Sequence, residues 1–154
     1  MPLRCRDMSN RVVIMRGVSG SGKSTYIRDH LPGAYVCSAD HFFIGTDGVY
    51  RFNPTKLGEA HRWCYRKFLT ALSDWRELIV VDNTNTQLFE FYGYIQLAWA
   101  HDYEVSAVRM DTPVEIAAAR NLHGVPAAGV EAMAARFQTI PTFLGIPEKV
   151  VKGI

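Results

Sequence analysis

A glycine-rich loop near the start of the chain has the residue types and spacing of a phosphate-binding site. Residues 17–24 read GVSGSGKS and match the pattern G-x-x-x-x-G-K-[ST] in full. The glycines let successive backbone N–H groups surround a phosphate, and a helix starting at Lys23 directs its positive end at the same anion. The Lys23 side chain can reach the β- and γ-phosphates, and the Ser24 hydroxyl can hold Mg²⁺. We expect nucleotide contacts from Gly17, Ser19, Gly20, Ser21, Gly22, Lys23, Ser24 and Thr25.

A second candidate position follows the apolar run 78–81 (LIVV). Asp82 stands where an acidic residue helps to position Mg²⁺ through water. Many hydrolysing P-loop ATPases, which this region resembles, carry a glutamate directly after that aspartate, whereas this chain has Asn83. An amide cannot take a proton at neutral pH, so the pattern favours transfer to an acceptor over hydrolysis. The alternative for residues 83–85 is an ordinary loop and helix-capping cluster.

The candidate general base is Asp40, in the run SADHFF after a short apolar segment at 34–38. A kinase needs a carboxylate beside the phosphate loop to orient the attacking hydroxyl and to accept its proton. The alternative is a turn or helix-capping aspartate. The neighbouring His41 is interpreted as structural or solvent-exposed.

Aromatic and basic residues follow Asp40. Four aromatic residues flank a turn at 45–48, and they form either a small hydrophobic cluster or a platform for a stacked base: Phe42, Phe43, Tyr50 and Phe52. Five basic residues lie between 51 and 67, where Glu59 is the only acid: Arg51, Lys56, Arg62, Arg66 and Lys67. Arg62 and Arg66 share a helix face that either contacts a phosphodiester backbone or is simply solvated.

Two arginines are candidates for a short lid over the phosphates. Arg120 begins the run RNLHGVP at the end of one expected helix, and Arg136 lies on the next. A lid arginine excludes water and neutralises charge that develops during phosphoryl transfer. The alternative for each is a surface ion pair.

Strand-like and helix-like segments alternate along the chain. Strands are expected at 11–16, 34–38, 78–81 and 104–110, and helices at 23–30, 53–75, 87–100, 113–122 and 126–140. This alternation predicts a parallel sheet with right-handed crossovers, on which ligands bind at the carboxyl ends of the strands. Residues 1–10 are interpreted as a loose leader and residues 150–154 as a short tail.

Composition bounds the class of protein. The 154 residues allow about one domain, expected over 1–154 with a core at about 11–140. Hydrophobic residues at 48% and charged residues at 21% exclude a disordered or collagen-like chain, and a net charge of +2 does not by itself indicate nucleic acid. Three widely spaced cysteines and the lack of a long apolar run predict a soluble, cytoplasmic, intracellular protein without a membrane partner.

Taken in order, five motifs resemble one family. They are GVSGSGKST, SADHFF, DGVYRFNP, VVDNTN and ARNLHGVP, within about residues 11–140. They resemble the small P-loop kinases that include the phage polynucleotide kinase domain, and most closely the kinase-like domain of NEDD4-binding proteins. The resemblance implies an α/β fold, a P-loop NTPase of the adenylate-kinase-like type, with a parallel sheet of order 2-3-1-4 flanked by helices, and a short lid. It implies ATP and Mg²⁺ as cosubstrates, Lys23 and Ser24 at phosphate and metal, Asp40 as base, Asp82 in the metal–water network and Arg120 in the lid.

The acceptor side departs from that family. Phe43 stands where the phage enzyme has a substrate-binding arginine, and Arg51 is the candidate replacement. We expect acceptor contacts from Asp40, Phe43, Arg51, Arg62, Asn83 and Asn85. The expected acceptor is a nucleic-acid hydroxyl of DNA or RNA, either a 5′ end or a hydroxymethylated pyrimidine, and no obligate protein partner is indicated. The alternatives are a kinase for a small molecule (a nucleoside, nucleotide, sugar or antibiotic) and a nucleotide-gated binding module.

Overall fold

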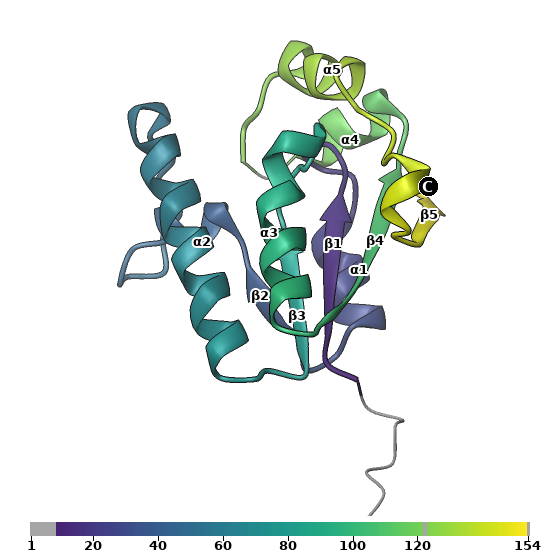
Figure 1. Cartoon of the computed structure of the whole chain (residues 1–154). Helices are drawn as coiled ribbons and strands as arrows, with labels where there is room; N and C mark the ends of the chain where they lie inside the picture. Colours follow the sequence, from purple (N-terminus) through teal and green to yellow (C-terminus); the bar gives the residue numbers. More distant parts are fainter. Residues whose placement is uncertain (1–8, 122, 154) are drawn as a thin grey trace, which may run out of the picture.

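A parallel sheet forms the centre of the molecule. The computed structural model describes residues 9–121 and 123–153, and its strands lie in the order β2-β3-β1-β4-β5 (Figure 1). They are β1 (Arg11–Arg16), β2 (Tyr35–Cys37), β3 (Leu78–Asp82), β4 (Glu104–Asp111) and β5 (Glu148–Lys152). Every neighbouring pair is parallel. The expected order 2-3-1-4 is therefore confirmed, and β5 extends it.

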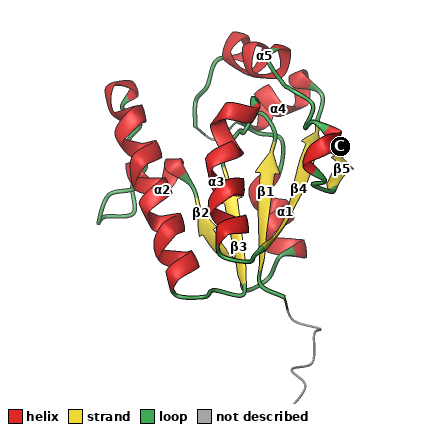
Figure 2. Ribbon diagram, viewed as in Figure 1, coloured by secondary structure: helices red, strands yellow, loops and turns green. Residues whose placement is uncertain are grey.

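Helices cover both faces of the sheet and the carboxyl ends of its strands (Figure 2). One face carries α2 (Leu57–Ser73) and α3 (Leu88–Ala100), and the other carries α1 (Lys23–His30). Two short helices, α4 (Val114–Arg120) and α5 (Ala127–Ala135), lie beyond the strand ends. Short 3-10 turns complete the chain: η1 (Ala39–Phe43), η2 (Pro54–Lys56) and η3 (Thr142–Leu144).

The sequence pattern explains these layers. In β1, Val12 and Ile14 enter the core under α2 and α3, whereas Val13 and Met15 enter the core under α1. Residues 12–15 are therefore apolar, as expected of a strand that is covered on both faces of the sheet. In α2 the buried residues recur at helical spacing: Ala60, Cys64, Phe68, Ala71 and Leu72. Across residues 9–121 and 123–153, none of the helices combines the length and the apolar composition that a bilayer crossing requires.

Two expectations about the C-terminal part are wrong. Residues 148–152 form β5 rather than part of a tail, because they pair in parallel with residues 107–111 of β4. The helix expected over 126–140 ends at Ala135. The residues after Ala135 do not continue the helix. The Gln138 N–H donates instead to the Thr86 carbonyl at 2.7 Å. The predicted leader falls largely on residues 1–8, outside the described residues.

The last residue of β1, Arg16, is completely buried and connects several segments. Its Nη1 forms a 2.7 Å ion pair with Glu148 of β5. The guanidinium also lies over the rings of Phe91 and Phe137, 4.9 and 4.6 Å from their centroids. Burial lowers the pKa of Arg16, and the Glu148 carboxylate opposes that change. Its Nε donates to the Asn85 carbonyl, and its Nη2 donates to the carbonyls of Thr86 and Gln138.

We predict that Arg16→Met lowers the free energy of unfolding by about 3–5 kcal/mol, because it leaves a carboxylate and several carbonyls without their donor. Urea denaturation measures this change. Arg28→Met is the matched control, since Arg28 pairs with Asp29 on the surface, and such pairs contribute about 0–1 kcal/mol. Equal losses in the two variants would contradict the structural importance given to Arg16.

Candidate active site

The phosphate loop lies between β1 and α1 and is shaped by two glycines with positive φ. Gly20 has φ 79° and Gly22 has φ 98°, a conformation that other residues rarely adopt. A Cβ added to Gly20 would collide with the Ala117 carbonyl oxygen of α4. The loop is thus in direct contact with the helix that precedes the predicted lid. The Ser21 Oγ is buried and has no hydrogen-bond partner among the described residues, so a polar group is available inside the loop.

The structure brings three predicted charged residues into one electrostatic cluster. The Lys23 Nζ donates to the Gly17 and Val18 carbonyls at 2.8 and 3.1 Å. Burial lowers the pKa of Lys23, and the nearby carboxylates of Asp82 and Asp40 oppose that change. Burial raises the pKa of Asp82, and Lys23 opposes that rise. An anionic phosphate would supply the lysine with a better partner than two carbonyls do.

The donors predicted for Mg²⁺ are consistent with that ion. Asp82 is half-buried at the end of β3, and Ser24 is exposed in the first turn of α1. Both offer hard oxygen atoms, which Mg²⁺ prefers. Within the described chain, no group of three or more histidine, cysteine or acidic side chains could hold a metal ion alone. This donor set fits a magnesium ion that takes its other ligands from phosphates and water.

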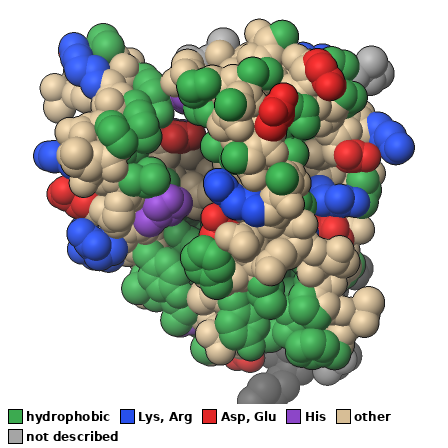
Figure 3. All heavy atoms as spheres, turned by 90° about the horizontal axis from the view of Figure 1, so that it is seen from above, with side chains coloured by type: hydrophobic (Ala, Val, Ile, Leu, Met, Phe, Trp, Pro, Cys, Tyr) green, Lys and Arg blue, Asp and Glu red, His purple; other side chains and the backbone are tan. Residues whose placement is uncertain are grey.

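A cavity of about 490 Å³ adjoins the phosphate loop at Ser19. Its volume lies in the range of about 300–1,000 Å³ that is usual for ligand sites. Seen from the carboxyl ends of the strands, the surface is hollowed, with acidic and histidine side chains along the hollow (Figure 3). Asp40 and Asn83 line the cavity, and much of the wall is aromatic: Tyr50, Phe52, His61, Tyr65, Phe89 and Tyr94. The candidate base therefore lies in a pocket with stacking surfaces.

Side chains from other segments surround Asp40, whose own side chain is 52% exposed. The Tyr50 hydroxyl lies 3.5 Å from Asp40 Oδ1, and His123 Nε2 lies 3.8 Å from Oδ2. Burial and the Asp40 charge raise the pKa of Tyr50 to about 12, so its hydroxyl stays protonated at neutral pH. The Asn83 Oδ1 accepts the Ala39 N–H at 2.9 Å and fixes the start of η1.

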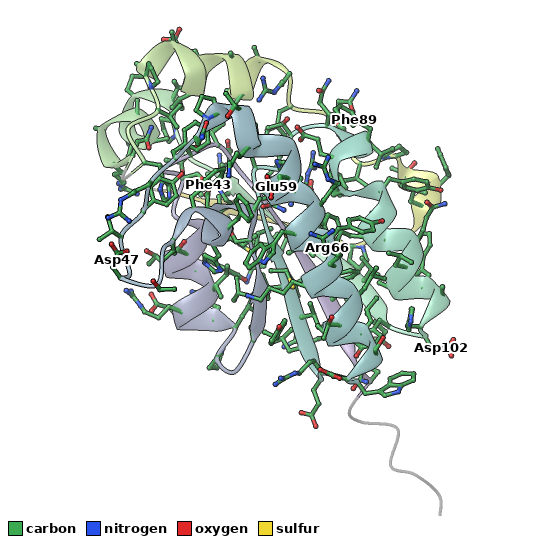
Figure 4. The ribbon with its side chains drawn as sticks, turned by 90° about the vertical axis from the view of Figure 1, so that its left-hand side faces the viewer. Phe43, Asp47, Glu59, Arg66, Phe89 and Asp102 are labelled. Atoms are coloured by element: carbon green, nitrogen blue, oxygen red, sulfur yellow. The ribbon has the colours of Figure 1, made fainter. Side chains whose placement is uncertain are left out.

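Four predicted acceptor residues present little or no surface to this cavity. Phe43, labelled in Figure 4, is 6% exposed. Its ring centroid lies 5.1 Å from that of Phe52, which is the hydrophobic-cluster alternative. Asn85 lies at the cavity wall, but it is 2% exposed and its amide donates to the Met15 carbonyl. Arg51 pairs with Asp47 on the exposed turn at 2.7 Å, and Arg62 is exposed on α2 outside the cavity lining.

The two predicted lid arginines occupy different places. Arg120 is exposed in the last turn of α4, between Ala117 and Asn121, whose backbone atoms lie closest to Gly20. Arg136 lines the acceptor cavity, and its Nε donates to Thr86 Oγ1 at 3.3 Å. The cavity that Arg136 lines also includes Ser19 of the phosphate loop, so the expected contact of Arg136 with the cofactor stays a prediction.

Several cavity residues were given no role by the sequence pattern. His61 and Tyr65 are four residues apart on α2, a spacing that places them on one helix face. Phe89 stands in the first turn of α3 and is 77% exposed (Figure 4). His123 comes from the loop between α4 and α5. The helical spacing on α2 could be detected in the sequence. The meeting of α2, α3 and the loop between α4 and α5 at one cavity could not.

Residues 12–140 match the model of a family described as an AAA domain, AAA_33. Human (Homo sapiens) NEDD4-binding protein 2 is 35% identical over 153 residues, a match that covers 90% of this chain and 8% of that protein. The chain thus spans less than a tenth of the length of this curated relative.

Solved structures show the same fold at low sequence identity. A chain of the Pnkp1/Rnl/Hen1 RNA repair complex has a TM-score of 0.67 and 17% identity, covering 86% of this chain and 45% of that one. The APS kinase CysC of Mycobacterium tuberculosis, in complex with AMPPNP and APS, has a TM-score of 0.61 and 20% identity, covering 94% and 88%. A sugar kinase from Janibacter sp. HTCC2649 has a TM-score of 0.61 and 17% identity, covering 93% and 85%. The fold is therefore of the P-loop kinase type.

The contact between the phosphate loop and α4 can be tested with two glycines of almost equal φ. Gly20 has φ 79° and Gly33 has φ 78°, but only Gly20 has a backbone neighbour in the way of a Cβ. We predict that Gly20→Ala loses about 1–3 kcal/mol more unfolding free energy than Gly33→Ala, and that Gly20→Ala alone weakens nucleotide binding. Denaturant melts and binding of a fluorescent nucleotide measure both effects. Equal behaviour of the two variants would contradict a structural role for this contact.

Proposed function

The chain belongs to the AAA_33 family of AAA domains, and we propose that it is a kinase that transfers the γ-phosphate of ATP to a hydroxyl group of a nucleic acid. The observation that carries this proposal is the position of Asp40. Its carboxylate lies in an aromatic-walled cavity that also reaches Ser19 of the phosphate loop. The expected phosphate-donor site therefore adjoins the expected acceptor site, and the candidate base lies in the cavity between them.

The residues divide the reaction between positioning and proton transfer. The loop N–H groups and Lys23 hold the β- and γ-phosphates, and Ser24 and Asp82 would hold Mg²⁺, which supplies charge neutralisation when bound. Asp40 orients the acceptor hydroxyl and takes its proton as the new P–O bond forms. Asn83 occupies the position after Asp82 and is engaged in fixing η1. The lack of a carboxylate there favours transfer over hydrolysis.

The cavity wall supports a nucleotide unit as the acceptor. Aromatic side chains provide faces on which a base can stack. Phe52 is 49% and Phe89 is 77% exposed, so their rings remain accessible at the surface of the cavity. The Arg136 guanidinium offers charge for a phosphodiester on the same side. A 5′-hydroxyl end and a hydroxymethylated pyrimidine are both primary alcohols joined to a base that can stack, so either acceptor fits this chemistry.

The comparisons support the two halves of the proposal separately. AMPPNP bound to the APS kinase supports an adenine nucleotide as the phosphate donor. The likeness to a chain of an RNA repair complex supports a polynucleotide as the acceptor. The sugar kinase of the same fold makes a small alcohol the natural competing acceptor.

The experiment follows label from γ-labelled ATP, with Mg²⁺, into 5′-hydroxyl DNA and RNA, DNA containing 5-hydroxymethyluracil, and a small sugar alcohol. We predict transfer to one of the polymers. Asp40→Asn should lower kcat by about 10²–10⁴-fold without changing ATP binding, because it removes only the base. Asp47→Asn, an exposed aspartate on the neighbouring turn, is the matched control and should retain activity. Label appearing only in the sugar or as free phosphate would overturn the nucleic-acid acceptor.

Stacking at the cavity can be tested separately. Phe89→Ala should raise KM for the acceptor roughly 5- to 150-fold, which corresponds to about 1–3 kcal/mol of base stacking, with little change in KM for ATP. Phe143→Ala is the matched control, because Phe143 is 84% exposed but lies outside the cavity lining. An unchanged acceptor KM in Phe89→Ala would exclude this ring from acceptor binding.

A further inference from the structure

Each carboxylate oxygen of Asp40 faces a side chain from another segment, the turn after η1 for Oδ1 and the loop between α4 and α5 for Oδ2. The Tyr50 hydroxyl is 3.5 Å from Oδ1, and His123 Nε2 is 3.8 Å from Oδ2. The His123 and Tyr50 rings also contact each other, with centroids 4.4 Å apart. Asp40, Tyr50 and His123 therefore form one cluster at the edge of the cavity that all three line.

The loop between α4 and α5 is built so that it presents His123. The Asn121 Oδ1 accepts the His123 N–H at 3.0 Å, and the Asn121 Nδ2 donates to the Val125 carbonyl at 2.6 Å. Gly124 has φ 70°, which favours glycine, and Pro126 is the N-cap of α5. These residues of the motif RNLHGVP thus have structural tasks within the loop itself. The His123 side chain is 39% exposed and points instead to Asp40.

We propose that His123 is a positioning residue for phosphoryl transfer, which holds the Asp40 carboxylate in register with the acceptor hydroxyl. This inference rests on the proposed function. The 3.8 Å separation is longer than a hydrogen bond. Catalytic contacts of this kind are commonly long in the absence of substrates and shorten in the complex.

The position of α4 explains why such a contact matters. Ala117 of α4 packs directly on Gly20 of the phosphate loop, and the loop after α4 carries His123 to Asp40. The donor side and the acceptor side are therefore joined through one short segment. Because an error of about 1 Å in the position of a reacting group can cost about 10²-fold in rate, contacts that hold the two sides in register have a direct kinetic value.

The bonding changes stay with the substrates and Asp40. The acceptor oxygen bonds to the γ-phosphorus, the bond from that phosphorus to the bridging oxygen breaks with its electrons passing to ADP, and the hydroxyl proton moves to Asp40. His123 forms and breaks no covalent bond in this reaction. Its contribution is orientation of the carboxylate, so its removal should affect kcat through Asp40 and leave the binding of ATP unchanged.

The experiment compares His123→Phe with His123→Gln, each alone and combined with Asp40→Asn. Phenylalanine keeps the ring that packs on Tyr50 but loses the polar atoms, whereas glutamine keeps an N–H donor of similar reach. We expect His123→Phe to lower kcat by up to about 100-fold with KM for ATP unchanged, and His123→Gln to recover most of that loss. In the Asp40→Asn background, His123→Phe should change kcat by no more than about twofold, because both substitutions act through one group.

The matched control is His30→Phe. His30 is an exposed histidine at the end of α1 whose ring stacks on Tyr26, with centroids 4.5 Å apart, and it lies outside the cavity lining. It should leave kcat unchanged. Full activity in His123→Phe, or the full loss persisting in the Asp40→Asn background, would overturn the positioning role while leaving the proposed function intact.

A second measurement does not depend on activity. Hydrogen exchange of the amides of Asn121 and of residues 123–125 reports whether this loop is held by Asp40. We expect faster exchange in Asp40→Asn than in the unsubstituted protein. Equal exchange would overturn the contact. Failure of the unsubstituted protein to transfer phosphate to any acceptor would overturn the proposed function instead, so the two failures are distinguishable.

Discussion

The guanidinium of Arg16 is the buried charge around which the functional end of the sheet is assembled. It lies at the end of β1, one residue before the phosphate loop, and it binds β5 through Glu148. It also binds the carbonyls that follow β3, where the Gly17 N–H donates to the Thr84 carbonyl at 3.0 Å. A buried charge has to satisfy its donors, so these segments have to meet at one place. The origin of the phosphate loop is fixed by the same requirement.

The site follows from this framework and from the helix above it. Arg16 fixes the start of the phosphate loop at the end of β1, and α4 contacts the same loop at Gly20. Asn83, directly after β3, sets the position of η1 and hence of Asp40. The loop after α4 then reaches Asp40 through His123. In the proposed reaction, the donor phosphates and the acceptor hydroxyl would lie at the carboxyl ends of strands of one sheet, the place where ligands bind in open α/β folds.

The sequence predicted those parts whose signals are local. The phosphate loop, the two-faced apolar strands and the strand order of the resembled family are confirmed. The strand β5 was missed because its five residues are largely exposed at a sheet edge and become a strand only by pairing with β4. The end of α5 and the position of Arg136 depend on long-range hydrogen bonds to Thr86. The aromatic cavity joins several segments, so no spacing within one of them reveals it.

The central claim is that this fold transfers phosphate to a polynucleotide. The most direct measurement is the mass of a 5′-hydroxyl oligonucleotide, and of one carrying a hydroxymethylated pyrimidine, after incubation with ATP and Mg²⁺, with ADP quantified in the same sample. We predict that one oligonucleotide gains a single phosphoryl group for each ADP formed. ADP accompanied only by free phosphate, with both oligonucleotides unchanged in mass, would contradict it.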